Sequence, residues 1–237
     1  MDEKDLLSGG IDVLCESDEE IKSLIAPNRG KITSQLENYI KEIEIFNSAY
    51  GLVGVNDKNE LIIKHILDSL APLGIINRLL KETNAKNTPQ IADAGSGAGL
   101  PGIPLAIALP DFDFTLIERM GRRAGFLWNT KASLGISNIT VKEEELEKTT
   151  PERFHLVTFR AFKPLEPKLL KTLFRVCVKG GVIAAYKGRR EKIEQEMAPL
   201  KKLLLLECGW EGLPYTVPFL DEERHLLVIK TPKINKI

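Results

Sequence analysis

Apolar side chains recur every three or four residues in the first third of the chain, which is the spacing of an amphipathic helix. The clearest such stripe consists of Leu36, Ile40, Ile43 and Phe46. We place the N-cap of this helix at Thr33 or Ser34, and we predict a third helix over about residues 59–70. Residues 1–82 are therefore expected to form an N-terminal helical extension.

A shorter helix is predicted ahead of that stripe, ending at Ile25. Ser17 and Glu20 have the spacing of a capping box, in which each side chain satisfies a free backbone N–H of the first turn. The Pro-Asn-Arg-Gly sequence at residues 27–30 combines two residues that disfavour helix, so we expect it to end this helix.

Short apolar runs alternate with helical patterns after the polar stretch 81–89. Strands are predicted near residues 90–94, 113–117, 139–142, 155–159 and 181–186. Helices are predicted near residues 101–109, 119–134, 164–178 and 190–206. Such alternation favours a parallel sheet covered on both faces, an α/β domain that spans residues 83–237.

The end of the chain breaks the alternation. Two runs with strand character, 210–217 and 226–230, are separated only by residues 218–224. A parallel connection needs a dozen residues or more, so these two strands should pair as an antiparallel hairpin. The expected sheet therefore has seven strands, mostly parallel, with an antiparallel pair at the end.

Three alternating glycines, Gly95, Gly97 and Gly99, follow the first predicted strand directly. Glycine tolerates positive φ and lets a backbone approach a ligand closely, as in the nucleotide-binding loops of doubly wound domains. The second predicted strand ends at Glu118, 23 residues after Gly95, where such folds place the acid that binds ribose hydroxyls. A nucleotide-like cofactor is the first hypothesis.

A dinucleotide is one candidate, because Gly97, Gly99 and Gly102 fit the G-x-G-x-x-G pattern. In the register that starts at Gly95, however, the third glycine position holds Leu100. The terminal hairpin also argues against it, since a dinucleotide domain continues with parallel crossovers. An NAD(P)-dependent oxidoreductase is therefore the rival enzyme hypothesis.

The acid-x-Gly-x-Gly-x-Gly loop from Asp93, the acidic end of the second strand and the closing hairpin together resemble the class I S-adenosylmethionine-dependent methyltransferases. This resemblance implies a Rossmann-like seven-stranded sheet and S-adenosyl-L-methionine as the cofactor. The glycine loop would pack against the methionine and ribose, and Glu118 would hold the ribose hydroxyls.

Further segments resemble one family of these enzymes, the small-subunit ribosomal RNA methyltransferase G family, also called glucose-inhibited division protein B. The matching segments run in family order at residues 64–70, 94–105, 115–123, 126–127, 160–162, 186–188 and 223–230. The pairing of Leu100-Pro-Gly-Ile-Pro-Leu105 with a terminal Glu223-Arg-His225 is far more specific than the glycine loop.

The family resemblance implies transfer of a methyl group to N7 of a guanosine in 16S rRNA. By motif position, the implied cofactor contacts are Gly95, Ser96, Gly97, Gly99, Leu100, Glu118, Leu146, Glu147 and Arg160. Guanine N7 carries a free lone pair and no proton, so we expect no catalytic base. A ribosome-assembly factor that kept the fold without turnover is the non-enzymatic alternative.

The charge of the chain is zero overall but unevenly distributed. Residues 1–20 carry eight acids against Lys4, and the rest holds 32 basic and 25 acidic residues. Between Thr158 and Arg190, nine basic residues face only Glu166, which suits a polyanionic partner such as 16S rRNA or the 30S subunit. The predicted RNA contacts are Arg122, Arg123, Lys163, Lys187, Arg189, Arg190, Arg224 and His225, with Arg160 also a candidate.

The cysteines and the hydropathy of the chain indicate neither a metal site nor a membrane segment. Cys15, Cys177 and Cys208 lie far apart without metal-ligand spacing, and the sequence shows neither a signal peptide nor a membrane-spanning run. We expect a cytoplasmic monomer without a metal or membrane partner. His65 and Asp68, three residues apart on a predicted helix, are expected to fix the N-terminal helices against the domain rather than to form a catalytic pair.

Overall fold

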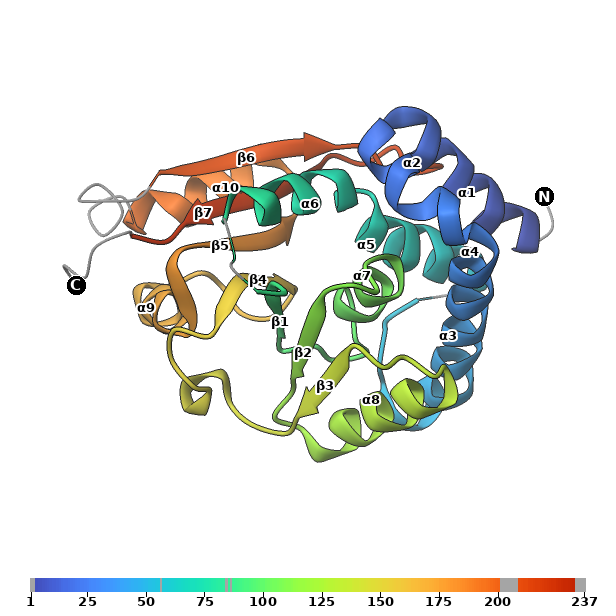
Figure 1. The fold of residues 1–237 in the computed structure, drawn as a ribbon, viewed down its shortest axis with the longest axis horizontal. Coiled ribbons are helices and arrows are strands. Elements are labelled where there is room, and N and C mark those ends of the chain that lie inside the picture. Colours follow the sequence, from blue (N-terminus) through green and yellow to red (C-terminus); the bar gives the residue numbers. More distant parts are fainter. Residues whose placement is uncertain (1–2, 56, 84, 86, 201–208, 233–237) are drawn as a thin grey trace.

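A seven-stranded sheet forms the centre of the computed structural model, which describes residues 3–55, 57–83, 85, 87–200 and 209–232 (Figure 1). The strands are β1 (Gln90–Ala94), β2 (Asp113–Ile117), β3 (Ile139–Lys142), β4 (Phe154–Arg160), β5 (Cys177–Lys187), β6 (Trp210–Tyr215) and β7 (Arg224–Lys230). Their spatial order is β3-β2-β1-β4-β5-β7-β6.

The strand pairings confirm the predicted mixed sheet. β1 pairs in parallel with β2 and β4, while β7 lies antiparallel to both β5 and β6. The order reverses at β1, because β2 and β3 lie on one side of it and the chain then crosses to β4 on the other side. In open α/β sheets, ligands bind at the carboxyl ends of the strands beside such a reversal.

Helices cover both faces of the sheet. On one face α9 (Pro167–Val176) and α10 (Arg190–Met197) pack on apolar side chains of β4, β5 and β7. On the other face α7 (Gly102–Ala108) and α8 (Gly121–Ser133) share one continuous core with the N-terminal helices. The helix predicted over 190–206 runs through α10 and a short turn, η4 (Ala198–Leu200), and its last residues lie outside the described ones.

The N-terminal region contains more helix than the sequence predicts. Its elements are α1 (Glu3–Ser17), α2 (Glu19–Ile25), η1 (Ala26–Asn28), α3 (Arg29–Tyr50), α4 (Lys58–Leu61), the π-helical turn η2 (Ile62–Leu67), α5 (Asp68–Leu70) and α6 (Leu73–Glu82). The prediction missed α6 and also α1, which contains Gly9 and Gly10. Gly10 is needed there, because a Cβ on it would overlap the side chain of Leu67.

The predicted end of the first helix at Ile25 is confirmed, but both predicted N-caps are wrong. Asp18, not Ser17, caps α2 by accepting a hydrogen bond from the Glu20 N–H at 2.8 Å, while the Ser17 hydroxyl donates to Leu14 O. Neither Thr33 nor Ser34 caps the next helix, because α3 begins at Arg29, directly after the single 3₁₀ turn that follows α2. Proline is tolerated in a first turn, where its missing N–H has no partner to lose.

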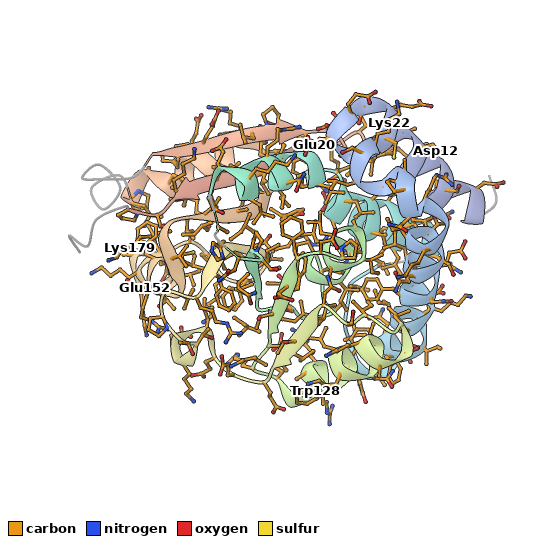
Figure 2. The ribbon with its side chains drawn as sticks, viewed as in Figure 1. Asp12, Glu20, Lys22, Trp128, Glu152 and Lys179 are labelled. Carbon is orange, nitrogen blue, oxygen red and sulfur yellow. The ribbon has the colours of Figure 1, made fainter. Side chains whose placement is uncertain are left out.

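The acids of the first twenty residues pair with cations of their own chain. Asp12 pairs with Arg29 and Asp18 with Arg78, while Glu20 pairs with Lys81. Figure 2 shows Asp12 and Glu20 on the α1–α2 pair of helices. This acidic segment thus packs α1 and α2 against α3 and α6. None of the helices described is long and apolar enough to span a membrane.

Candidate active site

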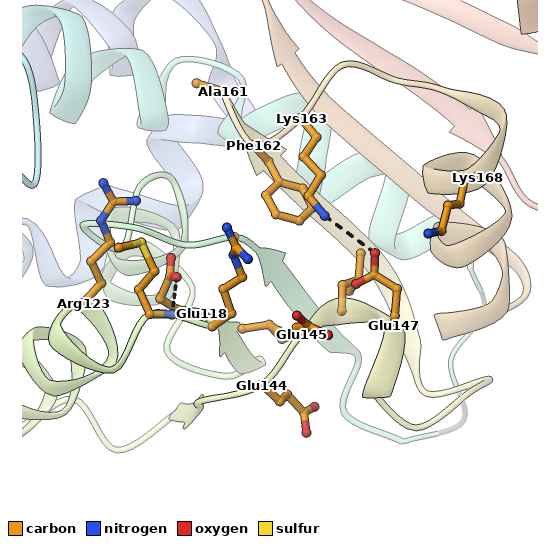
Figure 3. Close-up of a pocket in the computed structure, with 14 residues that line it drawn as sticks. Glu118, Arg123, Glu144, Glu145, Glu147, Ala161, Phe162, Lys163 and Lys168 are labelled. Carbon is orange, nitrogen blue, oxygen red and sulfur yellow. Dashed lines mark hydrogen bonds and ion pairs between the residues drawn. The ribbon is translucent and has the colours of Figure 1, made fainter.

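The loops that follow β1, β2, β3 and β4 surround a cavity of about 620 Å³ at the carboxyl edge of the sheet (Figure 3). The lining residues are Gly95, Ile117, Glu118, Arg119, Met120, Arg123, Glu144, Glu145, Leu146, Glu147, Ala161, Phe162, Lys163 and Lys168. The cavity therefore brings together the glycine loop, the acid at the end of β2 and the acidic run after β3, as the spacing predicts.

The glycine loop requires glycine at all three positions. Gly95, Gly97 and Gly99 all have positive φ, at +67°, +56° and +89°. A Cβ on Gly95 would overlap the ring of Phe162, and one on Gly99 would overlap the side chain of Ile103. A Cβ on Gly97 would meet only the Gly95 carbonyl at 3.9 Å, so the space beside Gly97 is open.

The rest of the loop is held from beneath. The N–H groups of Gly95 and Ser96 donate to Ile117 O at 2.8 and 3.1 Å, and the buried Ser96 hydroxyl donates to Asp93 O. Leu100 packs in the core and is 6% exposed, so it supports the loop rather than lining the cavity.

Glu118 lies at the rim between the glycine loop and α8. Its carboxylate accepts the Gly97 N–H at 2.9 Å through Oε2 and the Met120 N–H at 2.8 Å through Oε1. A carboxylate has about four acceptor positions, so two backbone donors leave it capacity for a ligand. The side chain is 4% exposed, which fixes its orientation in the cavity wall.

Asp93 is a buried carboxylate that the sequence marks only as the acid before the loop. Its Oδ2 accepts the Gly102 N–H at 3.1 Å, whereas Oδ1 has no donor among the described residues. Burial raises the pKa of Asp93 to about 7. Asp93 is fully buried and does not line the cavity, so it supports the glycine loop from beneath through the Gly102 N–H.

A 3₁₀ turn, η3 (Leu146–Lys148), forms the wall opposite the glycine loop. Leu146 is buried, while Glu147 reaches across to Lys163 at 3.6 Å (Figure 3). The pKa of Glu147 is lowered by a hydrogen bond from its own backbone N–H and by the Lys163 ammonium. This ion pair joins the loop after β3 to the loop after β4.

Arg160 does not line the cavity, although it stands at the end of β4. Its guanidinium donates to Asp68 Oδ2 at 3.2 Å and to Lys64 O at 3.1 Å, and lies 2.7 Å from His65 Nδ1. Asp68 also accepts the Tyr215 hydroxyl at 3.0 Å and pairs with Arg224 at 3.5 Å. We call Asp68, His65, Arg160, Tyr215 and Arg224 the Asp68 cluster.

The Asp68 cluster joins η2 and α5 to β4 and to the terminal hairpin, so it supports the anchoring role predicted for His65 and Asp68. Burial, aided by the Arg160 charge, lowers the pKa of His65 to about 4, which leaves this imidazole neutral. Its Nδ1 can then accept a hydrogen bond from Arg160, with the ring proton on Nε2.

The other predicted RNA contacts divide into exposed and engaged side chains. Arg122 and Arg189 are exposed and form no ion pair with any described residue, and Lys163 and Arg123 line the cavity. Exposed Arg190 pairs with Glu194. Lys187 instead pairs with Glu196 at 2.7 Å, Arg224 belongs to the Asp68 cluster, and buried His225 lies 2.9 Å from Gly188 O through Nδ1.

Several lining residues were not predicted, among them Arg119, Met120 and Lys168. Arg119 and Met120 directly follow Glu118, so the position of that acid at a strand end was the available signal. Lys168 lies on α9 and gave no such signal. Among the described residues, no group of three or more histidine, cysteine or acidic side chains could hold a metal ion.

Comparison with known families identifies relatives over nearly the whole length. The family model of rRNA small subunit methyltransferase G matches residues 32–227. A Ribosomal RNA small subunit methyltransferase G from Treponema denticola is 39% identical over 97% of each chain. The protein of that name from Treponema pallidum is 42% identical over 83% of this chain and 84% of its own, and that from Cellvibrio japonicus is 35% identical over 87% and 89%.

Solved structures support the fold. A SAM dependent methyltransferase from Aquifex aeolicus superposes with a TM-score of 0.51 at 14% identity, covering 80% of this chain and 97% of that one. At this identity the likeness concerns the arrangement of the sheet and its helices, which is that of the class I methyltransferases.

Proposed function

This chain belongs to the rRNA small subunit methyltransferase G family, and from this membership we propose that it transfers a methyl group from S-adenosylmethionine to N7 of a guanosine in 16S rRNA. The observation that carries the proposal is the position of Glu118 and the glycine loop around one cavity at the carboxyl edge of the sheet.

The cavity suits S-adenosylmethionine in size and chemistry. Its volume of about 620 Å³ lies within the range of small-molecule sites, which is about 300–1,000 Å³. The open space at Gly97 lets a ligand lie close to the backbone, and the spare acceptor capacity of Glu118 suits a ligand with hydroxyl donors. When bound, S-adenosylmethionine supplies an electrophilic methyl group on a positively charged sulfur.

The residues of the chain would act by orientation. Glu118 would accept hydrogen bonds from the ribose hydroxyls, the Gly95–Gly97 backbone would lie against the ribose and methionine, and Leu146 with Glu147 would face the adenine. A contact between Arg160 and the cofactor remains a prediction. Its guanidinium is bound within the Asp68 cluster in this structure. Holding nucleophile and methyl group in line can supply about 7–11 kcal/mol of barrier reduction.

The RNA would approach from the side of the cavity that carries cations. Arg119, Arg123, Lys163 and Lys168 line the cavity, and exposed Arg122 directly precedes Arg123 on α8. Phe162, half-buried against Gly95, is the aromatic side chain best placed to stack an unpaired base. The glutamates after β3 line the same cavity and would repel phosphates from their part of it.

The decisive experiment is incubation of unmodified small subunits with S-adenosylmethionine carrying a labelled methyl group, followed by mapping of the modified nucleotide. We expect one 16S guanosine, methylated at N7. Label on another base or another position would overturn the proposal. Absence of label with intact cofactor binding would instead favour the assembly-factor alternative.

A further inference from the structure

Arg175, at the last turn of α9, holds the cavity wall from behind. Its guanidinium donates to three backbone carbonyls: Thr149 O at 2.8 Å, Glu147 O at 3.0 Å and Leu146 O at 3.1 Å. The side chain itself does not line the cofactor cavity, and it borders a second cavity on its other side. Figure 2 shows Glu152 and Lys179, which border that second cavity too, on the side of the molecule away from the N-terminal helices.

Two of these three carbonyls need a donor, because they lie at the end of a single 3₁₀ turn. The last carbonyls of a helix have no partner within it, and the negative end of the turn favours a cation. Leu146 O also accepts the Thr149 N–H at 3.2 Å, but for Glu147 O and Thr149 O the donor that the described contacts provide is Arg175. The planar guanidinium suits this task, since it presents several N–H groups in one plane.

The side chains of the held turn face the cofactor cavity. Leu146 and Glu147 line the cavity directly, and the Thr149 hydroxyl donates to Glu144 Oε1 at 2.9 Å, which restrains a third lining residue. The backbone of residues 146–149 is therefore fixed on one side by Arg175, while its side chains form the wall on the other.

We propose that Arg175 is a positioning residue, which sets the affinity for the cofactor by holding the 146–149 turn. This inference rests on the proposed function for the identity of the ligand, but the anchoring itself does not. Two experiments separate the two parts, with Arg175→Met as the test variant. Lys171→Met is the matched control, because Lys171 lies on the same helix and borders the same second cavity without a bond to the turn.

The first experiment measures the anchor in the protein without ligand. Residues 143–147 include four glutamates, so a glutamate-specific protease can report on local opening of this segment. We expect Arg175→Met to be cut there at least about tenfold faster than the wild type, since a lost charged hydrogen bond changes such an equilibrium by about that factor. Lys171→Met should be cut at the wild-type rate. Equal rates for all three proteins would overturn the anchoring.

The second experiment measures binding of S-adenosylhomocysteine by calorimetry and methyl transfer to small subunits. Arg175→Met should bind about tenfold or more weakly and show a raised KM for the methyl donor, with kcat at saturation nearly unchanged. Arg175→Lys, which keeps the charge but loses the planar set of donors, should fall between Arg175→Met and the wild type. A purely structural role would lower kcat with the folded fraction and leave KM as it is.

The outcomes are distinguishable. Faster proteolysis with unchanged affinity in Arg175→Met would overturn the positioning role, because the turn would be loosened without effect on the ligand. Failure of the wild type itself to bind S-adenosylhomocysteine would overturn the proposed function, while the protease comparison would still decide whether Arg175 anchors the turn.

Discussion

Charged side chains at the carboxyl edge of the sheet are used in two opposite ways in neighbouring regions. Around the cofactor cavity, carboxylates such as Glu118 accept backbone N–H groups and keep acceptor capacity free. In the Asp68 cluster, one carboxylate is surrounded by two guanidinium groups and a tyrosine hydroxyl. We call the first region the open region, because it keeps acceptors available to a ligand. We call the Asp68 cluster the closed region, because its charged groups bind one another and so join helices to strands.

The difference shows that residue type at a strand end does not decide function. Glu118 follows β2 and Arg160 ends β4, so both meet the spacing expected of a site residue. What separates them is the number of partners each already has. Arg160 makes three contacts that hold the fold, and it would have to give up some of these hydrogen bonds to turn toward a ligand, which costs free energy.

The largest effect on stability is expected from Asp68→Ala, which removes the central carboxylate of the closed region. Removing the carboxylate leaves Arg160 and Arg224, whose side chains are only 15% and 17% exposed, without their central partner. Breaking a buried pair on one side costs about 3–5 kcal/mol. We expect the free energy of unfolding in urea to fall by about that amount.

A suitable control for this variant is Glu19→Ala, which breaks the exposed pair with Lys22. Surface pairs contribute about 0–1 kcal/mol, so the control should unfold almost as the wild type does. If Asp68→Ala were no more destabilising than Glu19→Ala, the Asp68 cluster would not anchor the helices.

The next effect concerns pH and the neutral imidazole of the cluster. The pKa of His65 is about 4 in the folded protein, mainly through burial, against about 6.5 in an unfolded chain. Between these values the unfolded chain binds more protons, so stability falls as the pH falls from about 6.5 to about 4. The loss from this one group should be on the order of 2–3 kcal/mol.

His65→Gln isolates that contribution, because glutamine keeps a neutral acceptor and cannot titrate. Asp93 acts in the opposite direction: its pKa is raised to about 7, so its contribution to stability declines as the pH rises from about 4 to about 7. The quantity to measure is therefore the difference between the wild-type and His65→Gln unfolding curves across pH 4–7. A difference independent of pH would show that His65 is not held neutral.

In the cofactor cavity, Glu118→Gln should weaken S-adenosylhomocysteine binding by about 1–3 kcal/mol, with a smaller effect on the free energy of unfolding. Glutamine retains one oxygen for a backbone N–H but loses the charge and one acceptor. Glu143→Gln is the matched control, since Glu143 is exposed and does not line the cavity. Equal affinity in both variants would mean that Glu118 makes no ribose contact.

The fold and the open region could be predicted from local signals. Periodicity located most helices and strands, and the short link before β7 required the antiparallel hairpin. Gly95 and Glu118 were found because parallel strands deliver their following loops to one edge. The helix α1 was missed since its two glycines lower helix propensity, and the contact with Leu67 that requires Gly10 comes from another helix.

The Asp68 cluster and the contacts of Arg175 could not be predicted, because the residues that meet there are far apart in the sequence. Asp68 lies 92 residues from Arg160, next to a π-helical turn that no periodicity reveals. Arg175 is one of nine basic residues in its stretch, and only the folded chain places it beside the carbonyls of residues 146–149. Charge and spacing therefore found the candidates without showing which ones were already engaged.

The smallest expected effect tests that distinction directly on two predicted RNA contacts. Arg122 is exposed with no ion pair to a described residue, whereas Lys187 is half-buried against Glu196. The logarithm of the affinity falls linearly with the logarithm of the salt concentration. Removing one cation that contacts phosphate makes this negative slope shallower by about 0.7–0.9. We expect this change for Arg122→Gln binding to a 16S rRNA fragment, and no change for Lys187→Gln in preparations whose folding is verified by thermal unfolding. The opposite result would be a shallower slope for Lys187→Gln and an unchanged slope for Arg122→Gln. RNA would then have to displace Glu196 from Lys187, and a paired cation would be as available to the substrate as an unpaired one.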